Sequence, residues 1–365
     1  MKGSIVFARF GYTRISVHWT FAILLIWIFL ASSGTSDALW NVTFVLTVFL
    51  CVVLHEAGHA LAANFFGIRT VEITLLPIGG VATLEKLPNR PLAELTIAIT
   101  GPLVNFIISA LLFLPVKDLL NHGMVNALSA INGHNFLVNL FIVNLTMGIF
   151  NLIPAFPMDG GRVLRALLSI KLDRLTATKI AARIGQVLAI AAIMISVFTN
   201  QHAISSPTLL LISLFVFYSA LTELRSFTYW SILDGHTAGE VTMKEFGIVQ
   251  ASDKLSKATD MLLAGSFHNF LVVSNGKPVG TLDRSRLIRS LSESGKDTTI
   301  DNVMNTDLRT VQTDTPLEKV YETVMTHPEE PVMVTHGGEL TGVIDSDNLL
   351  EFVMIHQAST INRPA

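Results

Sequence analysis

At the centre of the sequence stands the stretch Val52-Val53-Leu54-His55-Glu56-Ala57-Gly58-His59-Ala60-Leu61-Ala62, an H-E-x-x-H pentad inside an apolar run. On an α-helix, His55 and His59 would project from one face, where two ring nitrogens can reach one Zn²⁺ ion. Glu56 would stand beside that face as a general base for the attacking water. The pentad therefore predicts a catalytic site with one zinc ion per chain. The alternative is a buried polar cluster in a helix bundle, although ionisable groups between such apolar flanks are costly unless they serve a function.

The composition is that of a membrane protein. Of the 365 residues, 50% are hydrophobic and only 15% are charged, and the mean hydropathy is +0.54. We therefore expect membrane-spanning segments in a lipid bilayer. The net charge of −3 and the lack of any basic block argue against a nucleic-acid partner. Cys51 is the single cysteine, so no intrachain disulfide can form.

The distribution of polar residues divides the chain into two regions. Residues 1–228 are apolar with sparse charges, residues 229–236 are the expected linker, and residues 237–365 have the composition of a soluble domain. Six apolar segments of the first region come close to the roughly 20 residues that cross a bilayer as a helix. They are residues 17–31, 42–66, 93–115, 136–154, 183–199 and 207–223. The alternative for the first segment is a cleaved signal peptide, with Ala31-Ser32-Ser33 as the cleavage site.

Lys and Arg residues orient these six segments. They are concentrated at the N-terminus and in the 67–92 and 155–182 loops, whereas the opposite side holds only Lys117. The positive-inside rule then places both termini and the soluble region in the cytoplasm of a multi-pass protein of the cell membrane. The second segment runs inward in this topology, and His59 lies about 10 Å before its cytoplasmic end.

A β-hairpin is predicted between the second and third segments. Residues 70–84 place β-branched side chains around Pro77 and the pair Gly79-Gly80. Because this stretch is unusually apolar for a loop, we expect the hairpin to dip toward the pentad. The alternative is a plain cytoplasmic loop.

Asp159 is the expected third metal ligand. It follows a helix break at Pro154 and Pro157, and Gly160-Gly161 after it allow close backbone approach. Irregular backbone at membrane depth is tolerated where it lines a cavity. The inward run of the fourth segment brings Asp159 to the same side as the two histidines. The alternative is that Asp159 only caps a helix over residues 160–169.

Other polar residues of the apolar region are further site candidates. His18 and Glu72 are the other candidates for the third ligand, although His18 is better placed for a contact with the substrate. Asn105, inside the third segment, must find a hydrogen-bond partner in the apolar interior. It either joins two helices or contributes to the site.

The soluble region contains an internal repeat of about 62 residues. Its copies cover about 237–292 and 299–355, and Gly280-Thr281-Leu282-Asp283 corresponds to Gly342-Val343-Ile344-Asp345. Each copy has the pattern of a helix, a short strand, a helix, two strands and a helix. We therefore expect a soluble α+β domain beside an α-helical membrane domain.

Three motifs together resemble the site-2 protease family of intramembrane zinc metalloproteases. They are the pentad, Gly101-Pro102-Leu103-Val104-Asn105, and the segment from Asn151 to Gly161. The resemblance covers residues 1–225 and looks like the branch that processes sporulation pro-sigma factors. It implies His55, His59 and Asp159 as zinc ligands and Glu56 as the base. It also implies that Asn151 lies near the substrate and that the hairpin 71–84 receives the unwound substrate strand. We place Asn105 and His18 beside Asn151 as candidate substrate-binding residues.

The repeat resembles a tandem pair of cystathionine-β-synthase (CBS) domains over residues 237–355. Such pairs are appended to some members of that protease branch, which implies regulation of the protease and a homodimer formed through the pair. Many nucleotide-binding copies end a Gly-x-x-Thr-x-x-Asp motif with an Asp that holds a ribose. Here those positions are Arg286 and Asn348, and Asp283 and Asp345 occupy the Thr positions. We therefore expect adenine-nucleotide binding to be weak or absent.

The sequence thus predicts an intramembrane zinc endopeptidase under the control of a CBS pair. Its substrates would be membrane-embedded or membrane-tethered proteins, such as an anti-sigma factor or a pro-sigma factor. The alternative is a CBS-regulated metal transporter or channel, in which the ionisable residues would line an ion path. The gathering of those residues near one membrane face argues against this alternative. The complete pentad argues against a third one, a catalytically inactive scaffold.

Overall fold

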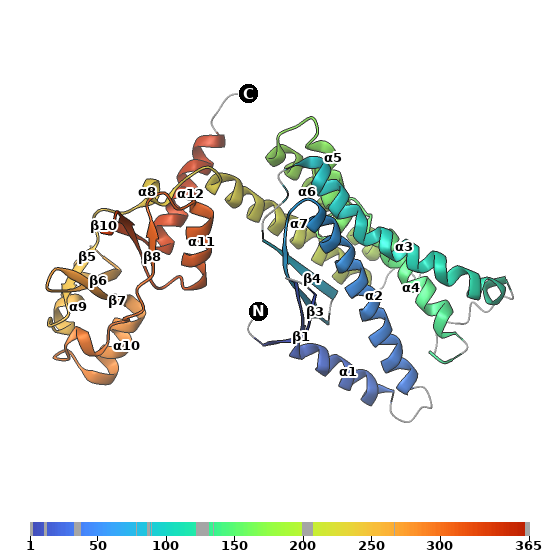
Figure 1. Ribbon diagram of the computed structural model, residues 1–365, viewed down its shortest axis with the longest axis horizontal. Coiled ribbons are helices and arrows are strands. Elements are labelled where there is room, and N and C mark those ends of the chain that lie inside the picture. The colour runs from blue at the N-terminus through green and yellow to red at the C-terminus, as the bar shows by residue number, and fades with distance from the viewer. Residues whose placement is uncertain are drawn as a thin grey trace. The chain divides into compact units, whose positions relative to one another are not determined.

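The computed structural model describes residues 3–10, 13–32, 38–77, 79–85, 88, 90–121, 131–133, 135–198, 207–265 and 267–361. The chain forms two compact units, Met1–Arg225 and Ser226–Ala365 (Figure 1). The first unit contains the pentad and the apolar segments, and the second contains the repeat.

The first unit is built mainly from helices. They are α1 (Trp19–Ala31), α2 (Ala38–Phe65), α3 (Pro91–Asn121), α4 (Phe136–Asn151), α5 (Asp159–Leu168), α6 (Arg174–Phe198) and α7 (Pro207–Leu233). Each predicted apolar segment overlaps one of these helices, and α2, α3, α6 and α7 are long and apolar enough to cross a membrane. The shorter helices α1 and α4 have 13 and 16 residues. They extend about 20 and 24 Å, which is less than the ~30 Å hydrocarbon core. The count of six spans therefore remains a prediction.

A four-stranded sheet lies beside α2 (Figure 1). Its strands are β1 (Ser4–Phe10), β2 (Thr13–His18), β3 (Thr70–Leu76) and β4 (Gly79–Leu84), in the order β1-β2-β3-β4. β2 and β3 pair in parallel, and the other neighbours pair antiparallel. The predicted hairpin is present as β3 and β4, and β4 forms one edge of the sheet.

The expectation of a small β-hairpin alone was incomplete, because the N-terminal strands β1 and β2 extend the hairpin to a four-stranded sheet. The apolar run expected to be helical from residue 17 remains a strand as far as His18, and α1 begins at Trp19. β2 buries Ser16, whose hydroxyl donates a hydrogen bond to Glu72 on β3. The pairing of β2 with β3 satisfies backbone groups that the start of an apolar segment would otherwise leave open.

A buried ion-pair cluster joins α5 to the helices around it. Arg165 Nε donates to Glu94 Oε1 at 2.6 Å, and Arg165 Nη1 donates to Glu223 Oε1 at 3.0 Å. Arg174 Nη2 donates to Glu94 Oε2 at 2.9 Å. Arg165 and Glu94 are only 3% and 4% exposed, so each charge depends on its partners. This Arg165 cluster holds α5, whose first residue is Asp159, against α3, α6 and α7.

The second unit contains two copies of one fold, in agreement with the repeat. Each copy has a three-stranded sheet, ordered β5-β6-β7 in the first and β10-β9-β8 in the second. The first copy consists of α8 (Ala238–Val241), β5 (Gly247–Gln250), α9 (Leu255–Leu263), β6 (Asn269–Ser274), β7 (Lys277–Asp283) and α10 (Arg284–Ser294). The second consists of η2 (Ile300–Asn302), β8 (Thr310–Gln312), α11 (Leu317–Thr326), β9 (Val332–His336), β10 (Glu339–Ile344) and α12 (Ser346–Ile361). It departs from the predicted pattern at its start, where η2 is a single 3₁₀ turn.

The expected linker over residues 229–236 is mostly helical. α7 continues to Leu233, which is fully buried in the core of the second unit with Leu317 and Val320. Gly235, with a φ of +85°, follows the end of the helix. The apolar residues at the end of α7 therefore belong to a packed core.

Candidate metal centre

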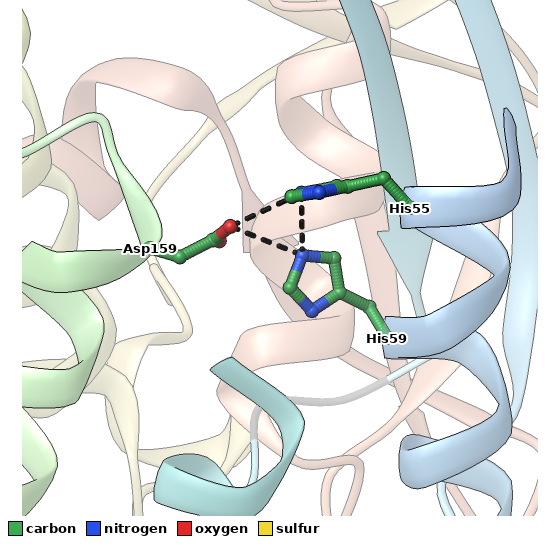
Figure 2. Close-up of side chains that lie close together, drawn as sticks. All are labelled: His55, His59 and Asp159. Carbon is green, nitrogen blue, oxygen red and sulfur yellow. Dashed lines mark hydrogen bonds and ion pairs between the residues drawn. The ribbon is translucent and has the colours of Figure 1, made fainter. Parts of the chain in front are cut away.

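Three buried side chains converge at the pentad (Figure 2). His55 and His59 project from α2, and Asp159 projects from the start of α5. The Nε2 atoms of His55 and His59 are 3.1 Å apart, and each lies 3.2 Å from Asp159 Oδ2. The exposed fractions of the three residues are 5%, 7% and 8%. The structure thus brings together the three residues predicted as metal ligands.

The arrangement fits a tetrahedral zinc site. Zinc binds His nitrogen and carboxylate oxygen at about 2.0–2.1 Å, which sets tetrahedral ligand atoms about 3.3 Å apart. The three measured separations, 3.1, 3.2 and 3.2 Å, are close to this value. Within the described part of the chain, these three residues form a group whose donor atoms could hold one metal ion. Three protein ligands leave a fourth position for water, as a catalytic site requires.

The outer nitrogens of both imidazoles have hydrogen-bond acceptors. His55 Nδ1 contacts Asn105 Oδ1, and His59 Nδ1 lies 2.6 Å from the carbonyl oxygen of Ile97 on α3. An acceptor at Nδ1 keeps the ring proton there, which leaves the Nε2 lone pair for a metal. Both rings are therefore held in the form that binds zinc through Nε2.

Two glycines let the backbone approach these side chains. A Cβ atom on Gly101 of α3 would lie 2.2 Å from His59 Nε2 and 2.7 Å from His55 Nε2. A Cβ atom on Gly160 would lie 2.2 Å from the carbonyl oxygen of Ile153. Real side chains cannot come so close, so glycine at both positions lets α3 cover the rings and lets α5 begin tightly against the preceding turn.

Glu56 lies against the edge strand β4. A Cβ atom on Gly80 would lie 2.8 Å from Glu56 Cγ and 3.3 Å from Glu56 Oε1. Among the strands that the structure describes, β4 pairs only with β3, so its outer edge is open to a further strand. The carboxylate predicted as the base is therefore adjacent to a strand edge.

The other candidates for the third ligand lie outside the cluster. His18 ends β2, and its Nδ1 is 2.7 Å from the hydroxyl oxygen of Thr20 at the start of α1. Glu72 accepts the hydrogen bond from Ser16. Asp159 is the first residue of α5 and Met158 is its N-cap, so the side chain of Asp159 is not used as the cap.

The two candidate asparagines, Asn151 and Asn105, differ in burial and in contacts. Asn151 is the last residue of α4, partly buried, at the turn that leads to α5. Asn105 is fully buried, and its amide contacts His55 and Asn144. Asn105 thus contacts a predicted metal ligand, and its contact with a substrate stays a prediction.

Sequence reasoning missed Asn144 and the Arg165 cluster. Asn144 is fully buried on α4 and accepts a hydrogen bond from Asn105. An asparagine in an apolar segment was the available signal, because an unpaired amide at membrane depth is costly. Glu94 and Arg165 carried the same signal as ionisable residues of a largely apolar region.

Two family models match the sequence. Peptidase family M50 matches residues 43–127 and 120–194, and the CBS domain matches residues 238–293 and 300–355. The first match includes the pentad and Asp159. The second follows the two copies of the repeat.

Similar sequences occur in other organisms. The zinc metalloprotease MJ0392 of Methanocaldococcus jannaschii is 35% identical over 341 residues, which cover 93% of this chain and 93% of that protein. Stage IV sporulation protein FB of Bacillus subtilis is 36% identical over 129 residues, or 35% of this chain and 41% of that protein. The solved structure of the site-2 protease from Methanocaldococcus jannaschii is 38% identical, covering 60% of this chain and 95% of that one with a TM-score of 0.43.

Proposed function

Because the chain belongs to peptidase family M50, and is thus a zinc metalloprotease of the site-2 protease type with a CBS domain pair, we propose that it cleaves membrane-embedded or membrane-tethered proteins within the bilayer. One observation carries this proposal. The buried cluster of His55, His59 and Asp159 is centred on α2, a helix long enough to cross a membrane, with Glu56 on the same helix.

The residues of the cluster divide the chemistry between them. His55, His59 and Asp159 would hold the zinc ion, which when bound polarises the scissile carbonyl as a Lewis acid. Glu56 takes a proton from the water that attacks the carbonyl carbon. A C–O bond forms, the C–N bond breaks, and Glu56 passes the proton to the leaving amine nitrogen. The products are a carboxylic acid and an amine.

The edge of β4 would hold the substrate. A membrane-spanning helix hides its peptide bonds in its own hydrogen bonds, so the substrate must unwind locally before cleavage. An extended substrate segment that adds to the outer edge of β4 regains backbone hydrogen bonds by strand addition. The close approach of Gly80 to Glu56 supports this position, because it puts the base next to that edge. Asn151 would contact the substrate near the turn before α5.

The substrates would be single-span regulators held at the membrane. The distribution of Lys and Arg places the cluster nearer the cytoplasmic face, together with both termini and the CBS pair. An anti-sigma factor or a membrane-tethered pro-sigma factor would meet the cluster from that side. The CBS pair would regulate the cleavage and provide a contact between two chains.

Co-expression with candidate substrates tests the proposal. Tagged single-span membrane proteins would be expressed with the wild type, with Glu56→Gln and with Glu85→Gln, a control at an exposed carboxylate. We expect a shortened substrate fragment with the wild type and with the control, and none with Glu56→Gln. Fragments of equal amount with all three chains would show that the cleavage comes from another protease.

A further inference from the structure

A chain of buried polar groups leads from His55 into α4. His55 Nδ1 contacts Asn105 Oδ1, and Asn105 Nδ2 donates to Asn144 Oδ1 at 3.1 Å. Asn144 Nδ2 in turn donates to the carbonyl oxygen of Leu140 at 2.9 Å, and its other near neighbour is Cys51 Sγ at 3.5 Å. Both asparagines are fully buried, so water cannot replace any of these partners.

The direction of each amide in this chain is decided by the next group along it. A backbone carbonyl can only accept, so Leu140 fixes the Nδ2 end of Asn144 toward itself. Asn144 Oδ1 then faces Asn105. Because this oxygen can only accept, Asn105 presents its Nδ2 donor toward α4. Asn105 Oδ1 is left facing His55, where it can only accept the Nδ1 proton.

The orientation of the Asn105 amide decides which ring nitrogen of His55 carries the proton. A neutral imidazole carries one ring proton, and the acceptor at Nδ1 keeps it there and frees Nε2. If Asn105 flipped, its Nδ2 donor would face Nδ1 and move the proton to Nε2. A protonated Nε2 cannot bind a metal.

We propose that Asn144 is a positioning residue of the metal centre, which acts through Asn105 to hold His55 in its metal-binding tautomer. This inference rests on the proposed function, because it takes His55 as a zinc ligand. Asn144 itself touches neither His55 nor the reacting groups. The alternative is a purely structural hydrogen bond between α3 and α4. Such a bond would stabilise the fold without affecting the affinity for zinc.

Three variants of α4 separate these roles. Asn144→Leu removes the oxygen acceptor at similar volume. Asn105 Nδ2 then keeps only a weak thioether acceptor, Met147 Sδ at 3.6 Å, so Asn105 can flip. Asn144→Asp keeps the pattern, because a buried neutral acid accepts from Asn105 and donates to the Leu140 carbonyl. Asn139→Leu is the matched control, because Asn139 is another buried asparagine of α4 that donates to the carbonyl oxygen four residues earlier, that of Asn135.

Zinc affinity of the purified full-length chain, measured by competition with a chromophoric chelator, is the primary readout. We expect Asn144→Leu to weaken zinc binding about 10-fold or more, the size of effect known for groups that orient metal ligands. Asn144→Asp and Asn139→Leu should bind zinc about as tightly as the wild type. Thermal unfolding of the zinc-free chains shows how much each substitution affects the fold alone. Equal zinc affinities for Asn144→Leu and Asn139→Leu would overturn the proposal.

A double substitution separates the loss of the amide orientation from a general effect of Asn144→Leu on the fold. Asn105→Asp puts a carboxylate beside His55, which accepts the Nδ1 proton in either orientation. In that background, Asn144→Leu should cause no further loss of zinc affinity, and a further 10-fold loss would overturn the proposal. Wild-type zinc binding that Asp159→Ala does not weaken would instead remove the metal centre itself, and this inference with it.

Discussion

Arg165 Nε donates to Glu94 Oε1 at 2.6 Å across 71 positions of the sequence, in the interior of the first unit. The bond joins the helix that begins with Asp159 to the helix that covers the histidine rings with Gly101. A charge pair in this place sets the position of a metal ligand as well as the packing of helices. The metal centre therefore depends on contacts well outside its three ligands.

Arg165→Met tests this dependence. The substitution leaves Glu94 with Arg174 and removes one partner of Glu223. Loss of one member of a buried ion pair typically costs about 3–5 kcal/mol, because the remaining charge loses its compensation. We expect a lower unfolding temperature of the detergent-purified chain and a lower zinc content. Lys254→Met, at the exposed pair with Asp297, should change neither. An unchanged unfolding temperature in Arg165→Met would contradict the structural role.

Glu56→Gln is expected to retain about one zinc ion per chain and to lose nearly all peptidase activity. The glutamine keeps the shape of Glu56 but cannot take a proton from water. The measurements are metal analysis of the purified chain and cleavage of a substrate identified by co-expression. Substantial cleavage by a zinc-loaded Glu56→Gln chain would remove this residue from the mechanism.

Asp159→Ala is expected to lower both zinc content and activity, because it deletes one of three ligand atoms that lie 3.1–3.2 Å from one another. His18→Ala should largely keep its zinc, since His18 contacts Thr20 at the start of α1. Metal analysis of both variants decides between them. Full zinc in Asp159→Ala, with zinc lost in His18→Ala, would make His18 the third ligand.

Adenine nucleotides are expected to bind weakly or not at all. A cavity of about 310 Å³ lies between the two CBS copies, and its described lining includes Glu245, Asp345, Asp347 and Glu351 but neither Lys nor Arg. Phosphate groups would be repelled there. Asp345 Oδ1 also accepts the backbone N–H of Asn348 at 2.9 Å, so one carboxylate oxygen is used inside the fold. Calorimetry of the full chain with AMP and ATP tests this, and micromolar binding of either would refute it.

The second unit is expected to lie on the cytoplasmic side of the membrane. Lys277 is exposed in the second unit, and Lys277→Cys should react with an impermeant thiol reagent only after the cells are opened. Gln201, which lies outside the described residues, is predicted to face outward, so Gln201→Cys should react in intact cells. The native Cys51 is buried and should contribute little background. Labelling of Lys277→Cys in intact cells would contradict the cytoplasmic placement.

Local spacing was sufficient to predict much of this molecule. Two histidines four residues apart share a helix face wherever that helix lies, because the helical period is 3.6 residues. The turn residues around Pro77 and Gly79 predicted the hairpin, and the repeat predicted two similar copies in the second unit. The break at Pro154 and Pro157 led to Asp159 as a candidate ligand.

The tertiary structure alone decided the contacts that join distant segments. Parallel pairing of β2 with β3, and the bonds of Asn144 with Asn105 and of Arg165 with Glu94, involve residues that no local period relates. Each polar group was recognisable in the sequence as one that needed a partner, since burial without one is costly. The choice of partner depends on how whole helices and strands pack, and that packing placed Glu72 with Ser16 and gave His55 the support of Asn105.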